Sequence, residues 1–170
     1  MEQIIIRPLE KKDNEKLAAI IRNALTEFKA NKPGTVYFDE TTDHLFELFQ
    51  SGKGMYKVAL LNEELVGGAG IYHTDGLDND TCELVKLYLA PLARGKGIAK
   101  ELMTECLQAA KKAGYKKVYL ETMPELTVAV PMYEKFGFTY LKGPLGNSGH
   151  NGCGIWMIKN LENERETINS

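Results

Sequence analysis

The sequence of 170 residues has little of several features that mark specialised classes of protein. Its cysteines, Cys82, Cys106 and Cys153, are odd in number and irregularly spaced, which argues against a disulfide framework and favours reduced thiols in the cytoplasm. No run of about 18 apolar residues occurs, so a membrane-spanning helix is not expected. A net charge of −2 without a long basic run excludes the usual electrostatic signature of nucleic-acid binding.

The N-terminal region also lacks the pattern of a secretory signal. Met1–Leu9 contains no basic segment followed by a long apolar one, and we interpret it as part of a strand. Hydrophobic residues make up 44% of the chain, which is enough for one core in one domain. We expect that domain to cover residues 1–161 and residues 162–170, whose only aliphatic side chain is Ile168, to form a polar, flexible tail.

Hydrophobic periodicity predicts a single α/β domain in which helices flank a mixed sheet. Strands are expected where β-branched or alternating apolar residues occur, at Gln3–Arg7, Tyr56–Leu61, Leu65–Tyr72, Cys82–Leu89, Lys117–Thr122, Phe138–Leu141 and Ile155–Lys159. Helices are expected where apolar residues recur every three or four positions, at Asp13–Phe28, Thr42–Phe49, Gly97–Ala113 and Thr127–Phe136.

Individual residues mark the ends of several of these elements. Asp13 is expected to cap the first helix, and Asn31–Gly34 to break it. Asn62–Glu64 is expected to join two strands as a hairpin, and Gly114 stands where a glycine commonly ends a helix.

The stretch Arg94–Ala99, RGKGIA, lies between a strand that stops at Pro91 and a predicted helix. The first N–H groups of a helix have no partner inside it, and the helix dipole adds partial positive charge there. Glycines let a ligand approach the backbone closely, and Arg94 and Lys96 add formal charge. The turn is therefore suited to a pyrophosphate, although an ordinary turn with a solvated arginine and lysine would have the same shape. The glycine patterns of the P-loop and of dinucleotide-binding folds are both absent.

This stretch resembles the acetyl-CoA signature of the GNAT superfamily of N-acetyltransferases, Q/R-x-x-G-x-G/A, through Arg94, Gly97 and Ala99. Upstream, Glu83–Leu89 resembles the ELxxLYV strand of that family, and downstream, Met132–Phe138 resembles its LYEKxGF motif. The motifs occur in the family's order on the expected elements, and the resemblance extends roughly from residue 4 to residue 161.

One position departs from the pattern. Many relatives carry an asparagine where this chain has Leu126, so a side-chain contact to the cofactor is expected to be missing.

The resemblance implies a mostly antiparallel mixed sheet with a splayed parallel pair of strands in the middle, and acetyl-CoA as co-substrate without a metal. The pyrophosphate would bind the backbone N–H groups of Arg94, Gly95, Lys96, Gly97, Ile98 and Ala99. The pantetheine arm would pair with the backbone of Leu87, Tyr88 and Leu89. The N–H group of Leu87 would then stabilise the oxyanion that forms on the thioester carbonyl.

Two side chains are the candidates for proton transfer. Glu83 precedes Leu87 on the same strand and would accept the proton of the attacking amine, directly or through water. Tyr133 would donate a proton to the departing CoA thiolate, as its counterpart does in the family. The structural alternatives are a glutamate that only pairs with a nearby cation and a tyrosine that only packs in the core.

Two loops are candidates for the acceptor pocket, namely Asn31–Phe38 with Tyr37 and Gly143–Gly154 with Asn147 and His150. Both can equally be plain connectors. A zinc site at His150 and Cys153 is disfavoured because no set of four ligands is apparent. A nucleophilic Cys153, which would imply a ping-pong mechanism, is disfavoured because the family transfers acetyl directly.

The predicted function is N-acetyl transfer from acetyl-CoA to an amine of a small molecule or a protein. The alternatives are an O-acyltransferase or longer-chain acyltransferase and a non-catalytic acyl-CoA-binding module, because a fold does not determine the acceptor. Glu83 and Tyr133 favour an enzyme over a binding module. We expect no nucleic-acid or membrane partner. A homodimer is compatible with the sequence, which does not identify the acceptor.

Overall fold

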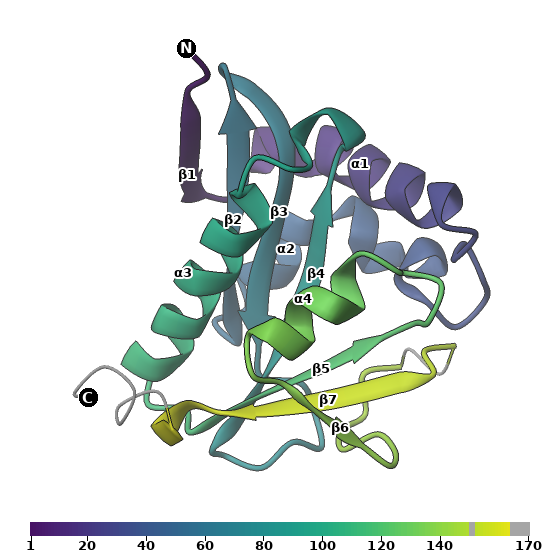
Figure 1. Ribbon diagram of the computed structural model, residues 1–170, viewed down its shortest axis with the longest axis vertical. Helices are drawn as coiled ribbons and strands as arrows, with labels where there is room; N and C mark the ends of the chain where they lie inside the picture. The colour runs from purple at the N-terminus through teal and green to yellow at the C-terminus, as the bar shows by residue number, and fades with distance from the viewer. Residues whose placement is uncertain (150–151, 164–170) are drawn as a thin grey trace.

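The computed structural model describes residues 1–149 and 152–163, and within these residues seven strands form one mixed sheet in the order β1-β2-β3-β4-β5-β7-β6 (Figure 1). The strands are β1 (Ile4–Pro8), β2 (Gly54–Leu61), β3 (Glu64–Tyr72), β4 (Thr81–Leu89), β5 (Lys117–Thr122), β6 (Thr139–Leu141) and β7 (Ile155–Asn160). The helices are α1 (Asn14–Glu27), α2 (Leu45–Phe49), α3 (Ile98–Lys112) and α4 (Ala129–Lys135). The predicted α/β domain is confirmed, and the element bounds shift by a few residues at most.

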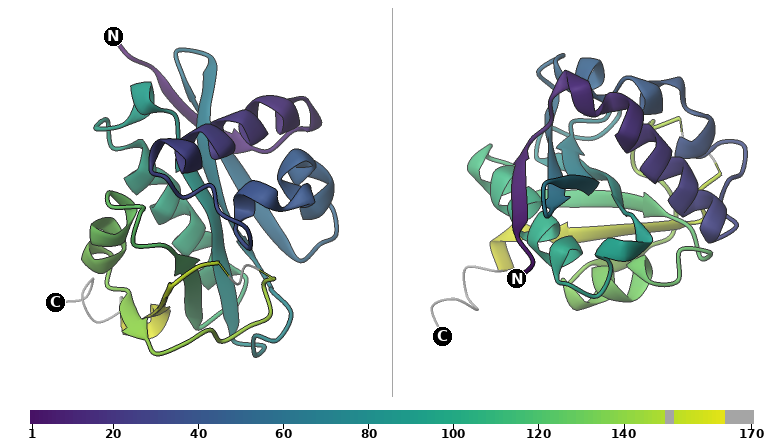
Figure 2. Two further views of the ribbon diagram at one scale, coloured as in Figure 1. Left: turned by 90° about the vertical axis from the view of Figure 1, so that its right-hand side faces the viewer. Right: turned by 90° about the horizontal axis from the view of Figure 1, so that it is seen from above.

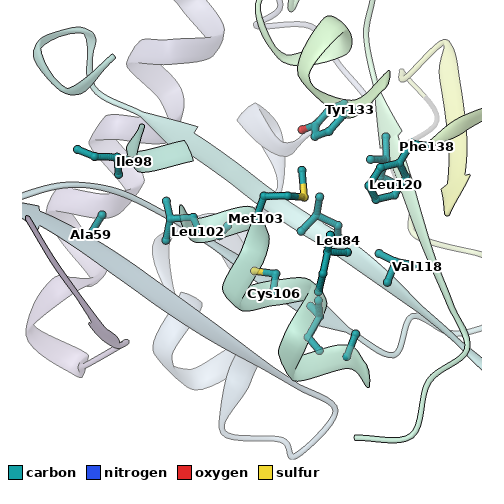
Figure 3. Close-up of a cluster of buried hydrophobic side chains, with 14 of the residues drawn as sticks. Ala59, Leu84, Ile98, Leu102, Met103, Cys106, Val118, Leu120, Tyr133 and Phe138 are labelled. Carbon is teal, nitrogen blue, oxygen red and sulfur yellow. The ribbon is translucent and has the colours of Figure 1, made fainter. Parts of the chain in front are cut away.

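The helices cover the two faces of the sheet in pairs, α1 and α2 on one face and α3 and α4 on the other (Figures 1 and 2). The buried residues accordingly divide into two clusters. On the α3 face, Leu102, Met103 and Cys106 recur at helical spacing and pack over Leu84 and the neighbouring strands (Figure 3). Each helix therefore buries one apolar stripe against the sheet, as the periodicity predicts.

The ends of the elements show which local signals acted as expected. Gly114 has φ 96° and follows α3, so it is the predicted C-terminal glycine. Asn62 and Glu63 have φ of 49° and 72°, which makes the β2–β3 connection a two-residue turn, one residue shorter than predicted. Asp13 occupies the N-cap position of α1 as predicted, but its side chain makes no capping hydrogen bond to the helix. Its buried carboxylate instead accepts two hydrogen bonds from Arg7, at 2.8 and 3.0 Å.

Strands β4 and β5 separate soon after they begin to pair. They are parallel and in register only from Thr81 to Glu83, opposite Lys117 to Tyr119. Beyond this point β4 has a strand partner on its β3 side only, and Figure 1 shows the two arrows diverging. The predicted splayed parallel pair in a mostly antiparallel sheet is thus confirmed.

A β-bulge in β4 accompanies the separation. Val85 lies opposite Gly70 and Tyr88 lies opposite Gly68, so Lys86 and Leu87 together face a single residue of β3. Lys86 has φ 54°, a left-handed conformation that residues other than glycine seldom adopt. Such a bulge bends its strand, which helps to turn β4 away from β5.

Candidate functional site

A cavity of about 230 Å³ opens where β4 and β5 separate. Its wall includes Arg94 and Gly97 at the start of α3 and Tyr133 of α4, all on one side of the sheet. It also includes Ala24 and Phe28 of α1 and its following turn, which lie on the other side. The cavity therefore reaches both faces of the sheet through the gap between the two strands.

The turn before α3 presents unpaired backbone donors to this cavity. Gly95 and Gly97 have φ of 76° and 80°, and a Cβ atom on either would meet nothing within 4 Å. The first helical N–H group with a backbone partner is that of Glu101, which donates to Gly97 at 3.1 Å. Among the described residues, no acceptor faces the N–H groups of Ile98 or Ala99. These donors and the dipole of α3 provide a site for an anion.

The two cations of the turn are engaged in ion pairs. Arg94 contacts Glu27 at 2.5 Å, donates to the Leu89 carbonyl at 3.1 Å and lies over the Phe28 ring. Lys96 contacts Glu2 at 2.5 Å and lies outside the cavity wall. Partly exposed pairs of this kind contribute little to stability, so an anionic ligand can compete for either cation.

Lys100 is a cation of the cavity wall that sequence reasoning missed. Its position in the first turn of α3, three residues after Gly97, is the signal that could have identified it.

The far half of β4 supplies a free strand edge inside the cavity. Leu87, Tyr88 and Leu89 all line it, and their backbone on the β5 side has no strand partner among the described residues. Extended ligands commonly bind such an edge by backbone hydrogen bonds.

Glu83 lies at the base of the gap, where β4 and β5 still pair, and lines the cavity. Its side chain is buried, with 4% exposure, and its Oε1 accepts a hydrogen bond from Thr74 Oγ1 at 2.5 Å. This hydrogen bond orients the carboxylate. A buried, oriented carboxylate in a cavity wall can accept a proton from a bound group.

Tyr133 of α4 lies in the opposite part of the wall, with its ring 6.0 Å from that of Phe138 (Figure 3). Its hydroxyl makes no hydrogen bond within the described part of the chain. Burial raises the pKa of Tyr133 above its ordinary value, so the hydroxyl keeps its proton at neutral pH. The group can therefore act as a proton donor.

The loops predicted to bind the acceptor lie together on the α1 side. The Gly152 N–H group donates to the Gly34 carbonyl at 2.8 Å, which joins the two segments directly. Thr35 and Val36 of the first loop line the cavity, whereas Tyr37 does not. The Tyr37 ring packs against Phe38 instead, and its carbonyl accepts from Arg22 at 3.0 Å.

The second loop contributes less to the wall than the prediction assumed. Asn147 lies outside the cavity wall, and its N–H group donates to the Asp75 carbonyl at 2.7 Å. His150 lies outside the described residues. Cys153 does line the cavity, and burial, together with the charges of Glu121 and Glu83, raises the pKa of its thiol to about 12. A protonated thiol is a poor nucleophile, which disfavours a ping-pong mechanism.

No group of three or more histidine, cysteine, aspartate or glutamate side chains in the described ranges is arranged to hold a metal ion. Over the same ranges, no helix is both long and apolar enough to cross a membrane.

Comparison with known proteins shows to which family the chain belongs. A sequence model of the Acetyltransferase (GNAT) family matches residues 19–138. The chain belongs to the GNAT family. The uncharacterized N-acetyltransferase YjgM of Escherichia coli is 36% identical to this GNAT protein over 159 residues, which are 92% of this chain and 95% of YjgM.

Solved structures of GNAT proteins share the fold. A GNAT acetyltransferase of Staphylococcus aureus superposes with a TM-score of 0.82 at 21% identity, covering 94% of this chain and 99% of the other. The PaiA N-acetyltransferase of Thermoplasma acidophilum, solved in complex with coenzyme A, gives a TM-score of 0.72 at 23% identity and covers 93% and 99%. The family match and the similarity to YjgM, rather than these structures alone, make this GNAT protein an acyl-CoA-dependent acetyltransferase.

Thr122, at the end of β5, is a further cavity residue of this GNAT enzyme that sequence reasoning missed. It is 3% exposed, and within the described ranges its Oγ1 is the one buried side-chain nitrogen or oxygen without a hydrogen-bond partner. Leu126 also lines the cavity, but its side chain offers no polar atom. The sequence signal that could have identified Thr122 is a polar residue at the end of a predicted buried strand.

Proposed function

We propose that this enzyme transfers the acetyl group of acetyl-CoA directly to an amine acceptor. The observation that carries the proposal is the single cavity that joins the free donors at the start of α3 to the buried carboxylate of Glu83 on the other side of the sheet. An anionic cofactor entering from the α3 side and an amine entering from the α1 side would meet in the gap between β4 and β5.

The cofactor is proposed to bind in two parts. Its pyrophosphate would accept hydrogen bonds from the backbone of Gly95–Ala99, where glycines at positive φ leave open space; the Arg94 N–H group is not available, because it donates to the Pro91 carbonyl at 3.2 Å. Its pantetheine arm would lie along the free edge of Leu87–Leu89 as an added strand. The Leu87 N–H group would then donate to the thioester oxygen as negative charge develops on it.

Thr122 is proposed as an additional contact to the pantetheine arm. Its side chain shares a face of β5 with Val118 and Leu120, two and four residues earlier, which pack on the α3 side. The hydroxyl therefore projects into the half of the cavity through which the arm would pass. A buried hydroxyl without a partner is costly, and an amide of the arm would relieve that cost. Thr122 would thus supply the hydrogen bond that Leu126 cannot.

The transfer requires two proton movements. The amine nitrogen attacks the thioester carbon, and the amine proton goes to Glu83, directly or through a water molecule. The C–S bond then breaks, and the sulfur takes a proton from Tyr133, whose raised pKa keeps it protonated. The products are an N-acetylated amine and CoA with a free thiol. Cys153 takes no covalent part because its thiol stays protonated.

The test is an acceptor screen that follows release of the CoA thiol from acetyl-CoA. Primary amines of several classes are supplied at saturating acetyl-CoA, and each product is identified by mass as an N-acetyl or an O-acetyl derivative. Acetylation of an amine that depends on Glu83 supports the proposal. Binding of acetyl-CoA without transfer to any amine, or transfer to hydroxyl groups alone, contradicts it.

A further inference from the structure

Lys86 is a cation in the cavity wall that the proposed chemistry does not use. It is partly buried, and no carboxylate of the described residues lies within ion-pairing distance of its ammonium. Burial lowers its pKa, and the more distant charges of Asp39 and Glu83 oppose that shift. Glu83 lies on the α1 side of β4, because its neighbours Cys82 and Leu84 pack on the α3 side. The α1 side is also the side from which the acceptor is expected to enter.

The backbone at Lys86 is held in a conformation unfavourable for lysine. A residue with a side chain at φ 54° costs about 1–2 kcal/mol relative to the right-handed region. The Tyr56 hydroxyl donates to the Lys86 carbonyl at 2.7 Å and holds the bulge in place. Gly68 makes this contact possible, because a Cβ atom there would lie 2.5 Å from the Tyr56 ring.

Lys86 combines two unfavourable features, a left-handed backbone conformation and a partly buried charge. Glycine or asparagine would occupy the left-handed position more easily than lysine, and either would avoid the cost of a partly buried ammonium. Strained positions that the surrounding structure enforces cluster at ligand-binding sites. The lysine at this position is thus better explained by binding than by stability.

We propose that the Lys86 ammonium binds a carboxylate of the acceptor, and that the acceptor is a small molecule carrying both an amine and a carboxylate, as an amino acid does. This inference rests on the proposed function. The amine would be presented to Glu83 while the carboxylate lies against Lys86, three residues further along the same strand. The opposite charges of Glu83 and Lys86 would thereby match the two charges of a zwitterion.

The test compares matched acceptors at saturating acetyl-CoA. Amino acids with aliphatic, aromatic and charged side chains are each paired with the amine that lacks the carboxylate, and CoA thiol release is followed. The wild-type enzyme should favour the carboxylate-bearing member of a pair by at least about 10-fold in kcat/KM. That ratio corresponds to one charge-assisted hydrogen bond.

The decisive variant is Lys86→Met, which keeps the length of the side chain and removes its charge. It should raise KM for the amino acid about 10- to 100-fold and leave the paired amine and the affinity for acetyl-CoA unchanged. Lys86→Arg should restore part of the preference. Lys57→Met is the control, because Lys57 lies outside the cavity and pairs with Glu105 at 2.9 Å.

The outcomes separate this inference from the proposed function. If Lys86→Met lowers kcat/KM equally for the amino acid and its matched amine, Lys86 only neutralises the negative charges of Asp39 and Glu83, and the inference is overturned. Acetylation of simple amines without acetylation of amino acids would overturn it too, while the proposed function would stand. Binding of acetyl-CoA with no acetylation of either kind of acceptor would overturn both.

Discussion

Gly97→Glu is the sharpest perturbation of the proposed cofactor site. Gly97 is the residue immediately before α3, and its positive φ of 80° allows the N–H groups of Ile98 and Ala99 to face the cavity. A Cβ atom at this position meets nothing within 4 Å, so a larger side chain would extend into the space proposed for the pyrophosphate. A glutamate there would bring a negative charge next to a negatively charged ligand.

The substitution has two separate effects, one on folding stability and one on affinity for the cofactor. Any residue with a Cβ at this φ costs about 1–2 kcal/mol of folding stability, which does not depend on the ligand. The repulsion between the new carboxylate and one pyrophosphate charge is roughly 3 kcal/mol at a separation of about 5 Å and an effective dielectric constant of about 20. We therefore expect the Kd for acetyl-CoA to rise about 100-fold or more.

Gly97→Ala is the matched control, because it carries the same backbone strain without charge or length. Isothermal titration calorimetry with acetyl-CoA on the folded variants, with Tm measured in parallel, separates the two effects. Both variants should lose similar stability, and only the glutamate variant should lose most of its affinity. An unchanged Kd in folded Gly97→Glu would show that the pyrophosphate binds elsewhere and would refute the reasoning.

Three further predictions concern the walls of the cavity. Tyr133→Phe should keep the fold and the acetyl-CoA Kd but lower kcat by about 10²- to 10⁴-fold, and a variant with the wild-type rate would show that Tyr133 only packs in the core. Because burial raises the pKa of Tyr133, the hydroxyl of the wild-type enzyme should stay protonated, and kcat should not fall for this reason, through neutral and mildly alkaline pH. Glu83→Gln should lower kcat/KM most at low pH, where more of the acceptor is protonated, and a pH–rate profile showing the same loss at every pH would indicate positioning instead. Thr122→Val should raise the acetyl-CoA Kd about 2- to 10-fold and leave Tm unchanged or higher, because it removes an unpaired buried hydroxyl. Thr122→Ser, which keeps the hydroxyl, is the control. An unchanged Kd of the valine variant in calorimetry would exclude the contact.

Most of the secondary structure follows from local patterns in the sequence. β5 coincides with the predicted strand at Lys117–Thr122, and α3 departs from its prediction by one residue at each end. Gly97 and Gly114 bound α3 because each occupies a backbone conformation that glycine adopts without strain. Such effects act over a few residues, so they can be inferred without knowledge of the rest of the chain.

Several individual contacts could not be predicted because their partners are distant or belong to other elements. Asp13 faces Arg7 across the turn between β1 and α1, and this ion pair takes the carboxylate that a helix cap would have used. Tyr37 and Asn147 lie in the loops expected near the acceptor, but their backbones hydrogen-bond to Arg22 of α1 and to Asp75, and neither residue reaches the cavity wall.

The sequence by itself determined the family motifs, the glycine turn and the order of the elements, because these are set by residues close together in the chain. Only the tertiary structure decided which side chains reach the cavity. Lys86 faces it because Tyr56, thirty residues earlier, holds the bulge from across Gly68. Thr122 borders the cavity because β4 and β5 part after Glu83, and its hydroxyl has no hydrogen-bond partner there among the described residues. Strand register and separation depend on pairing between remote segments, which no local pattern encodes.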